Sequence, residues 1–188
     1  MLRQVHYLDK SGPQNTDQCL AVTKELTNSG YRDIVIATTF GDTALKFAHV
    51  LNPKEINLVA VTHSAGFKNP NEVELTASRR KEIIDLGVKI YTGTILTHSL
   101  ETALTKEYGG VYPTTLITHT LRRFSQGVKV CVEIVMEACD AGYLPEDKEV
   151  VAVGGTGRGA DTVCIIKSAA SKRFLDLKVL EILAKPRQ

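Results

Sequence analysis

Apolar and polar positions along the chain alternate in blocks that predict strands followed by helices. Apolar, largely β-branched residues make up most of 33–37, 57–62 and 88–91, and nearly continuous runs of this kind are typical of strands that are buried on both faces. The segment 42–51 is apolar almost all round the helix that it would form. A helix of that kind is buried on most sides. The first half of the chain therefore predicts strands and helices in alternation.

The rest of the chain continues this alternation. Residues 128–139 carry apolar side chains at i, i+3, i+4, i+7, i+10 and i+11, so they predict the best-defined helix of the sequence. A helix after Asn71 is expected to bury Val73, Ala77 and Ile84 on one face. Further helices are expected at 15–29, 96–106 and 113–124, and further strands at 5–8, on both sides of 154–161, and at 177–184 as an edge strand.

Strands that alternate with helices indicate a sheet that is covered on both faces. We expect an α/β fold, a three-layer α/β/α sandwich with a mostly parallel, mixed sheet. The two strands around residues 154–161 are joined too closely for a parallel crossover, so they should be antiparallel. With 188 residues, of which 43% are hydrophobic and 23% are charged, the chain fits a single domain over residues 1–188.

Composition and charge argue against several classes of function. The net charge is +2 and aromatic residues make up 6% of the chain, so no nucleic-acid partner is expected. No apolar run approaches the length of a membrane span, and the first residues lack the form of a signal peptide. We therefore expect a cytoplasmic protein without a membrane partner. The histidines form no i, i+4 pair, so no metal site is expected, and homo-oligomer formation stays open.

The segment 154–161 has the most unusual composition in the sequence. It brings four glycines and Arg158 together within six residues, between two β-branched runs. Glycine lets the backbone approach a ligand closely, and free amide groups beside a guanidinium suit a phosphate. A tight β-turn with Arg158 in solvent is the plainer alternative. Residues 155–160 also fit the relaxed dinucleotide motif G-x-G-x-x-A, but a predicted strand follows where that motif needs a helix.

Residues 38–43 are the stronger candidate for binding an anion. They contain three threonines and Gly41 at the predicted start of a helix, where free amide groups and the helix dipole favour negative charge. Ordinary capping by Asp42 or Thr43 is the alternative, but it explains only part of the cluster. The carboxylate of Asp42 would repel a phosphate unless it points away and caps the helix.

Two more segments follow strands whose carboxyl ends should meet at the same edge of the sheet. Residues 63–67 supply hydrogen-bonding groups, a turn at Gly66, and the ring of Phe67, which either stacks on a ligand or covers the core. Thr94 comes after the next strand. The candidate binding residues are therefore Thr38, Thr39, Phe40, Gly41, Asp42, Thr43, His63, Ser64, Gly66, Phe67, Thr94, Gly155, Thr156 and Arg158.

The sequence contains no evident arrangement of acid, base and nucleophile, so the catalytic residues are unknown. His63 and Ser64 are adjacent on a strand end and point to opposite sides. Glu133 and Glu137 lie four residues apart in the apolar helix. Since buried carboxylates are uncommon, we expect them at its less buried edge. The four cysteines form no C-x-x-C motif, which predicts free core thiols in a reducing compartment.

Several of these segments resemble the C-terminal α/β domain of pyruvate kinase. Residues 38–44, Thr-Thr-Phe-Gly-Asp-Thr-Ala, look like its T-x-[ST]-G-[RK]-[ST]-A loop, which holds a sugar-phosphate effector in many pyruvate kinases. Residues 154–162 are similar to its late glycine-rich loop. Asp42 stands where the first loop has a basic residue, and this reversed charge argues against binding of a sugar bisphosphate.

The chain is more similar still to a small family of stand-alone archaeal and bacterial proteins that resemble this domain. The resemblance covers nearly the full length and rests on Asn15-Thr16, 41–44, Gly66-Phe67, 129–134, 149–155 and 158–162. It implies a sheet with one antiparallel strand. It also implies flavin mononucleotide (FMN) as the cofactor, because members of the family hold this molecule. The catalytic barrel of pyruvate kinase has no counterpart in this sequence, so pyruvate kinase activity is not expected.

FMN agrees with the candidate residues, because its phosphate suits residues 38–43 and its ring needs the apolar and polar contacts that 63–67 and Thr94 offer. Our leading hypothesis is a binding protein for a small phosphorylated ligand, with FMN as the favoured candidate, at the C-terminal edge of the sheet. The alternatives are a flavin-dependent oxidoreductase of unknown substrate and an effector-binding regulatory subunit. Whether the protein is an enzyme stays undecided.

Overall fold

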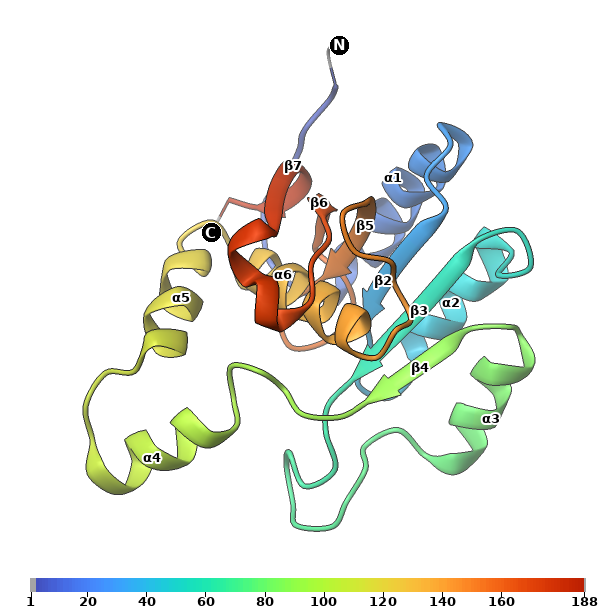
Figure 1. The fold of residues 1–188 in the computed structure, drawn as a ribbon. Helices are drawn as coiled ribbons and strands as arrows, with labels where there is room; N and C mark the ends of the chain where they lie inside the picture. The colour runs from blue at the N-terminus through green and yellow to red at the C-terminus, as the bar shows by residue number, and fades with distance from the viewer. Residues whose placement is uncertain (1–2, 188) are drawn as a thin grey trace.

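The computed structural model describes residues 3–187, which form a seven-stranded sheet with helices on both faces (Figure 1). The strand order is β1-β7-β6-β5-β2-β3-β4. The strands are β1 (His6–Leu8), β2 (Asp33–Ala37), β3 (Asn57–Thr62), β4 (Lys89–Thr92), β5 (Glu149–Gly154), β6 (Thr162–Lys167) and β7 (Lys178–Pro186). The helices are α1 (Thr16–Asn28), α2 (Asp42–Leu51), α3 (Ala77–Asp85), α4 (Leu100–Tyr108), α5 (Pro113–Leu121) and α6 (Gln126–Asp140), with 3-10 turns η1 (Pro13–Asn15) and η2 (Ser171–Asp176).

The sheet is mixed, and β6 is the strand that runs against its neighbours. It is antiparallel to β5 and to β7, whereas the pairs β1–β7, β2–β5, β2–β3 and β3–β4 are parallel. This confirms the expected mostly parallel α/β sheet and the antiparallel pair around residues 155–161. Because β2, β3, β4 and β5 are parallel, their carboxyl ends meet at one edge of the sheet.

The core has one apolar cluster on each face of the sheet. Along β2, Ile34 and Ile36 belong to the cluster under α1 and α2, and Val35 belongs to the cluster under α6. This division follows from the strand itself, since successive side chains point to opposite faces. All three residues are fully buried, as the apolar runs in the sequence predict for strands between two helical layers.

The strand near the C-terminus extends further than expected and is not at the edge. β7 lies between β6 and β1, because β1 adds to it in parallel, with His6 opposite Ala184. The prediction of an edge strand at 177–184 was therefore wrong on position. A three-residue strand carries too little pattern for the sequence to reveal its partner.

The helix expected after Asn71 begins later and buries a different face. Thr76 caps α3, with its hydroxyl accepting from the amide of Arg79 at 3.3 Å. Ile83 is fully buried, whereas 51% of the Ile84 side chain is exposed and Val73 lies outside the helix. Val73 is therefore not part of α3, and the helix turns the face that carries Ile83 to the core, so the predicted stripe of Val73, Ala77 and Ile84 was wrong.

The helices α4 and α5 lie beside the main body rather than over the sheet (Figure 1). α4 has no buried residue, and α5 ends at Leu121, so Phe124 is not on its stripe and is 53% exposed. Within residues 3–187, no helix is long and apolar enough to cross a membrane. The same residues contain no cluster of three His, Cys, Asp or Glu side chains suited to a metal. All four cysteines are free and buried, as expected.

Candidate functional site

A cleft of about 680 Å³ opens at the sheet edge where β2 and β3 end, between the segment that follows β5 and the helix α6. Clefts of a few hundred to a thousand Å³ are typical of small-molecule sites. Its lining includes candidate residues from three separate segments, together with a set of α6 side chains that sequence reasoning did not select. The candidates on the lining are Thr38, Thr39, Phe40, Asp42, Thr43, His63, Phe67, Gly155 and Arg158.

The turn before α2 is built around Gly41. This residue has φ of +95° and is the N-cap of α2, and its amide donates to the hydroxyl of Thr38 at 3.1 Å. A Cβ at position 41 would lie 3.0 Å from Cδ1 of Ile83 and from Cδ1 of Leu75. Gly41 and the hydroxyl of Thr38 therefore shape the turn, while Thr39 and Thr43 line the cleft. The first amide groups of a helix have no partner within it, so the start of α2 offers free donors and a positive dipole end.

Asp42 does not act as the helix cap. Its carboxylate lies 3.3 Å from the guanidinium of Arg79 on α3, and 71% of its side chain is exposed. The pairing offsets the negative charge that Asp42 places near the start of α2. The sequence-based objection to an anion at this position is weakened, although the reason is a partner on another helix rather than capping.

The glycine loop, residues 154–161, is held in shape by the buried side chain of Asp161. One carboxylate oxygen of Asp161 accepts from the amides of Gly12 at 3.0 Å and Thr156 at 3.1 Å, and the other accepts from the hydroxyl of Thr162 at 2.9 Å. The hydroxyl of Thr16 accepts from the amide of Ala160 at 3.0 Å. These hydrogen bonds tie the loop to the segment around η1.

Most of the glycines in this loop serve close packing. A Cβ on Gly159 would lie 2.5 Å from the hydroxyl of Thr16, and one on Gly155 would lie 2.6 Å from the carbonyl oxygen of Gly159. A Cβ on Gly154 would lie 2.7 Å from the carbonyl oxygen of Gly127 in α6. Gly157, with φ of +76°, meets nothing within 4 Å. The glycine content therefore reflects the fold as well as any ligand.

Arg158 joins the glycine loop to the turn before α2. Its guanidinium carbon lies 4.5 Å from the centre of the Phe40 ring, a distance typical of a cation–π contact. Of the cleft-lining cations, Lys46 pairs with Asp17 at 2.5 Å and Lys129 pairs with Glu133. Among residues 3–187, Arg158 forms no ion pair. Its charge is therefore available to an anion at the start of α2.

The segment after β3 forms an aromatic and polar wall. Nδ1 of His63 lies 2.6 Å from the carboxylate of Glu74, and the rings of His63 and Phe67 have centroids 4.0 Å apart. Ser64 and Gly66 do not line the cleft. Instead the amide of Phe67 donates to the carbonyl of Ser64 at 3.2 Å, and Gly66 has φ of +78°, so both shape the turn.

Thr94 and Thr156 also lie outside the cleft lining. After β4 the cleft wall is made by Ile95 and His98, a few residues later than expected. The amide of Thr156 donates to Asp161 at 3.1 Å, which gives this residue a role in the loop itself. The sequence correctly indicated the strand ends that meet here, but it did not indicate which side chain of each loop faces the cleft.

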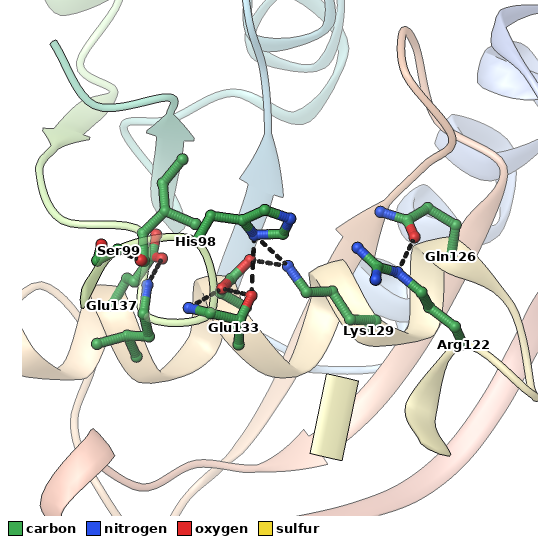
Figure 2. Close-up of polar contacts among 10 residues, drawn as sticks. His98, Ser99, Arg122, Gln126, Lys129, Glu133 and Glu137 are labelled. Carbon is green, nitrogen blue, oxygen red and sulfur yellow. Dashed lines mark hydrogen bonds and ion pairs between the residues drawn. The ribbon is translucent and has the colours of Figure 1, made fainter. Parts of the chain in front are cut away.

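The cleft has a polar floor, defined here as Lys129, Glu133 and Glu137 of α6, which appears in Figure 2 with His98 above it. These three side chains lie at i, i+4 and i+8 and are 2%, 5% and 2% exposed. The expectation that Glu133 and Glu137 mark the less buried edge of the helix was wrong. Their partners make burial tolerable, because Lys129 pairs with Glu133 and the amide groups of the segment 96–97 donate to both carboxylates.

Burial changes the proton affinity of these groups. The pKa of Glu137 is raised to about 8 by desolvation, with the carboxylate of Glu133 adding to the shift. Desolvation also lowers the pKa of Lys129, although Glu133 acts against it. The pKa of His98 is lowered by burial and by the positive charge of Lys129, whose Nζ lies 3.5 Å from its Nδ1. Near neutral pH the polar floor therefore holds a protonated Glu137.

The sequence did not lead us to expect this buried floor, although it contains a pattern that points to it. A lysine and two glutamates repeat at four-residue intervals inside an otherwise apolar helix, between Val128 and Ala138. Charged residues that share a face with buried residues are expected to have partners when the helix is covered on all sides. The partner segment, residues 96–98, lies 31 to 41 positions before the side chains that it contacts. It has no marked composition, so its approach could not be foreseen.

The fold and cleft define an α/β domain whose cleft lies at the carboxyl edge of a mixed sheet. Residues 18–166 match the family described as "Pyruvate kinase, alpha/beta domain", and the chain belongs to this family. The matched region includes both loops that Arg158 and Phe40 join. Among solved structures, a similarity is found to the crystal structure of O-ureido-L-serine synthase, with 16% identity and a TM-score of 0.32 over 70% of this chain and 48% of that one. A TM-score of this size does not establish a shared fold.

Proposed function

We propose that the protein binds a small phosphorylated molecule in the cleft, with the phosphate at the start of α2 beneath Arg158. The observation that carries this proposal is the position of Arg158 over Phe40, 4.5 Å from the ring centre. Phe40 directly precedes the N-cap of α2, so a guanidinium without an ion-pair partner in the described residues and a helix N-terminus lie side by side. Both favour a phosphate, and their effects reinforce each other.

FMN is the first candidate for this ligand. A flavin ring needs flat apolar cover together with a few polar contacts. The cleft offers Phe40, Phe67 and Ile95 as apolar cover and the polar floor along α6 as the source of hydrogen bonds. The resemblance to stand-alone proteins that hold FMN supports the same candidate. The volume of the cleft, about 680 Å³, is within the range for cofactor sites.

A flavin-dependent oxidoreductase is the second candidate function. The specific observation in its favour is the buried polar floor, because titratable groups with shifted pKa values that line a cleft are frequent at catalytic sites. An effector-binding regulatory subunit is the third candidate function. Membership of the family supports it, since this domain is part of pyruvate kinase.

Purification of the full chain and its visible spectrum test the proposal first. We expect either a yellow protein that releases a phosphorylated flavin, or a colourless protein whose thermal stability rises on addition of FMN. Bleaching of the bound flavin by NADH or NADPH would favour the oxidoreductase. A colourless protein whose unfolding temperature is unchanged by FMN would overturn the flavin proposal. If such a protein is stabilised by inorganic phosphate, the phosphate site stands with a different ligand.

A further inference from the structure

The cleft runs along α6 with different chemistry at its two ends. The first turn of α6 lies against the glycine loop, since the backbone of Gly127 packs closely against Gly154 and Thr162. The last turns lie against the segment after β4, where Glu137 accepts from the amide of Leu96 at 3.4 Å. At a rise of about 1.5 Å per residue, the helix separates these ends by roughly 15 Å. Arg158 and the start of α2 are thus at one end and the polar floor extends toward the other.

The polar floor has no unpaired positive charge that could bind a second anion. Its one ammonium, on Lys129, is bound to Glu133, and a second carboxyl group follows at Glu137 (Figure 2). The amide groups that approach from the segment 96–97 already donate to these two carboxyls, with Thr97 N at 2.9 Å from Glu133 Oε1. Arg122 also appears in Figure 2, but its Nε donates to Gln126 at 2.6 Å and it is not part of the cleft lining.

We propose that the protein selects phosphomonoesters whose far end is uncharged and forms hydrogen bonds, and that the polar floor rejects ligands with a second phosphate. This rests on the function proposed above. The ligand class that fits has a phosphate at one end, an apolar middle and a carbonyl, amide, imide or hydroxyl group at the other. Such a group can form hydrogen bonds with the floor and needs no free counter-charge. A buried second anion, in contrast, would lie close to carboxyl groups.

The protonation of Glu137 supports the same selection. With a pKa raised to about 8, its carboxyl group is mainly neutral at pH 7 and can donate an O–H to a carbonyl oxygen. The charged and titratable groups near it are Glu133, Lys129 and Asp140 on α6 and Tyr91 on β4. Two of these three charged neighbours on α6 are acidic side chains, so the surroundings of Glu137 remain unfavourable for a phosphate.

A matched pair of synthetic probes tests this selection on the full chain. The probes are 1,8-octanediol monophosphate and 1,8-octanediol bisphosphate, which share an apolar chain and differ only in the second phosphate. Isothermal titration at pH 7 should give at least about tenfold tighter binding of the monophosphate. Equal or tighter binding of the bisphosphate would overturn the selection while leaving the phosphate site in place. If neither probe binds and FMN and inorganic phosphate also fail to bind, the proposed function fails, and this inference fails with it.

The variant Glu133→Gln gives the second arm of the test. It releases the ammonium of Lys129 from its partner, so the ratio of bisphosphate affinity to monophosphate affinity should rise at least about tenfold. Glu82→Gln, an exposed glutamate of α3, is the matched control and should leave both affinities unchanged. An unchanged ratio of the two affinities in Glu133→Gln would contradict the role assigned to the floor.

Glu137→Gln provides a further check if Glu133→Gln does not fold. It is measured at pH 9, where Glu137 is ionised in the natural chain because its pKa is about 8. At that pH the substitution should reduce discrimination against the bisphosphate several-fold, and at pH 6 it should have little effect. Equal discrimination by the two proteins at pH 9 would overturn the inference.

Discussion

The guanidinium of Arg158 lies over the ring of Phe40, 4.5 Å from its centre. The two residues are 118 positions apart in the sequence, on the loop after β5 and on the turn before α2. Their contact brings a cation to the start of a helix across the mouth of the cleft. This relationship unites the two segments that the sequence indicated separately as anion sites.

Replacement of Arg158 should weaken binding without unfolding the protein. A charge-assisted hydrogen bond contributes about 1.5–3 kcal/mol, so Arg158→Met should lower affinity for a phosphorylated ligand about tenfold to hundredfold. The exposed Arg123 provides the control, and Arg123→Met should leave the affinity unchanged. Calorimetric titration with inorganic phosphate and with FMN measures both variants. Equal affinities in the two variants would mean that the phosphate binds elsewhere.

Gly41→Ala should destabilise the fold more than a comparable glycine substitution does. Position 41 combines φ of +95° with two side-chain atoms at 3.0 Å from the added Cβ, whereas Gly30 has φ of +106° and an open surrounding. Gly30→Ala should cost about 1 kcal/mol of unfolding free energy from backbone strain alone. Gly41→Ala should cost about 1–3 kcal/mol more, because Ile83 and Leu75 must move. Urea unfolding of both variants measures the difference, and equal losses would show that the contacts at position 41 are relieved easily.

Asp161 is expected to be a structural residue rather than a ligand contact. It is fully buried and accepts hydrogen bonds from Gly12, Thr156 and Thr162. Asp161→Asn places an amide donor against these donors and should lower the unfolding free energy by about 2–4 kcal/mol. The exposed Asp176 is the control, and its change to Asn should have an effect within about 0.5 kcal/mol. A loss of affinity in Asp161→Asn without any loss of stability would instead place Asp161 in the binding site.

Glu137 should make the protein less stable as the pH rises. Its pKa is raised from the ordinary value of 4.5 to about 8 in the folded state, so between these values the folded protein holds a proton that the unfolded chain has lost. The unfolding free energy therefore falls with increasing pH across this window. The total loss should be on the order of 2–5 kcal/mol.

Denaturant unfolding of the natural chain and of Glu137→Gln from pH 5 to pH 9 measures this effect. The variant should lack this part of the pH dependence and should be the more stable protein at pH 9. Parallel pH profiles for the two proteins would show that Glu137 does not titrate in this range. Glu82→Gln serves here as well, because an exposed glutamate should leave the profile unchanged.

The sequence predicted most of the sheet because its buried strands are recognisable as short apolar runs. β2, β3 and β5 are mainly runs of Val, Ile, Leu and Ala, and their charged residues, Asp33 and Glu149, stand only at the first position of a strand. The alternation of strands with helices then indicates layers. It could not place β1, since three residues carry no period. It also misjudged α3, which begins after the cap at Thr76 rather than at Asn71 and buries Ile83 rather than Ile84.

For the candidate site, the sequence indicated which loops meet but not what covers them. Parallel strands bring residues 38–43 and 63–67 to one edge, so their proximity follows from the fold class. The burial of Lys129, Glu133 and Glu137 depends on the path of residues 95–98 after β4, and that path has no local signature. Likewise the pairing of Asp42 with Arg79 could not be foreseen, because Arg79 lies on a helix whose packing was not known.

The comparison of FMN with riboflavin, which lacks only the phosphate, tests the central claim most directly. Fluorescence titration of both flavins should be done with the natural chain and with Arg158→Met. We expect the natural chain to bind FMN about a hundredfold more tightly than riboflavin, since a phosphate at a helix start and a guanidinium gains several charge-assisted hydrogen bonds. In Arg158→Met this preference should fall to about tenfold or less. Equal affinity of the natural chain for FMN and riboflavin would contradict the assignment of the phosphate to the Arg158 end of the cleft.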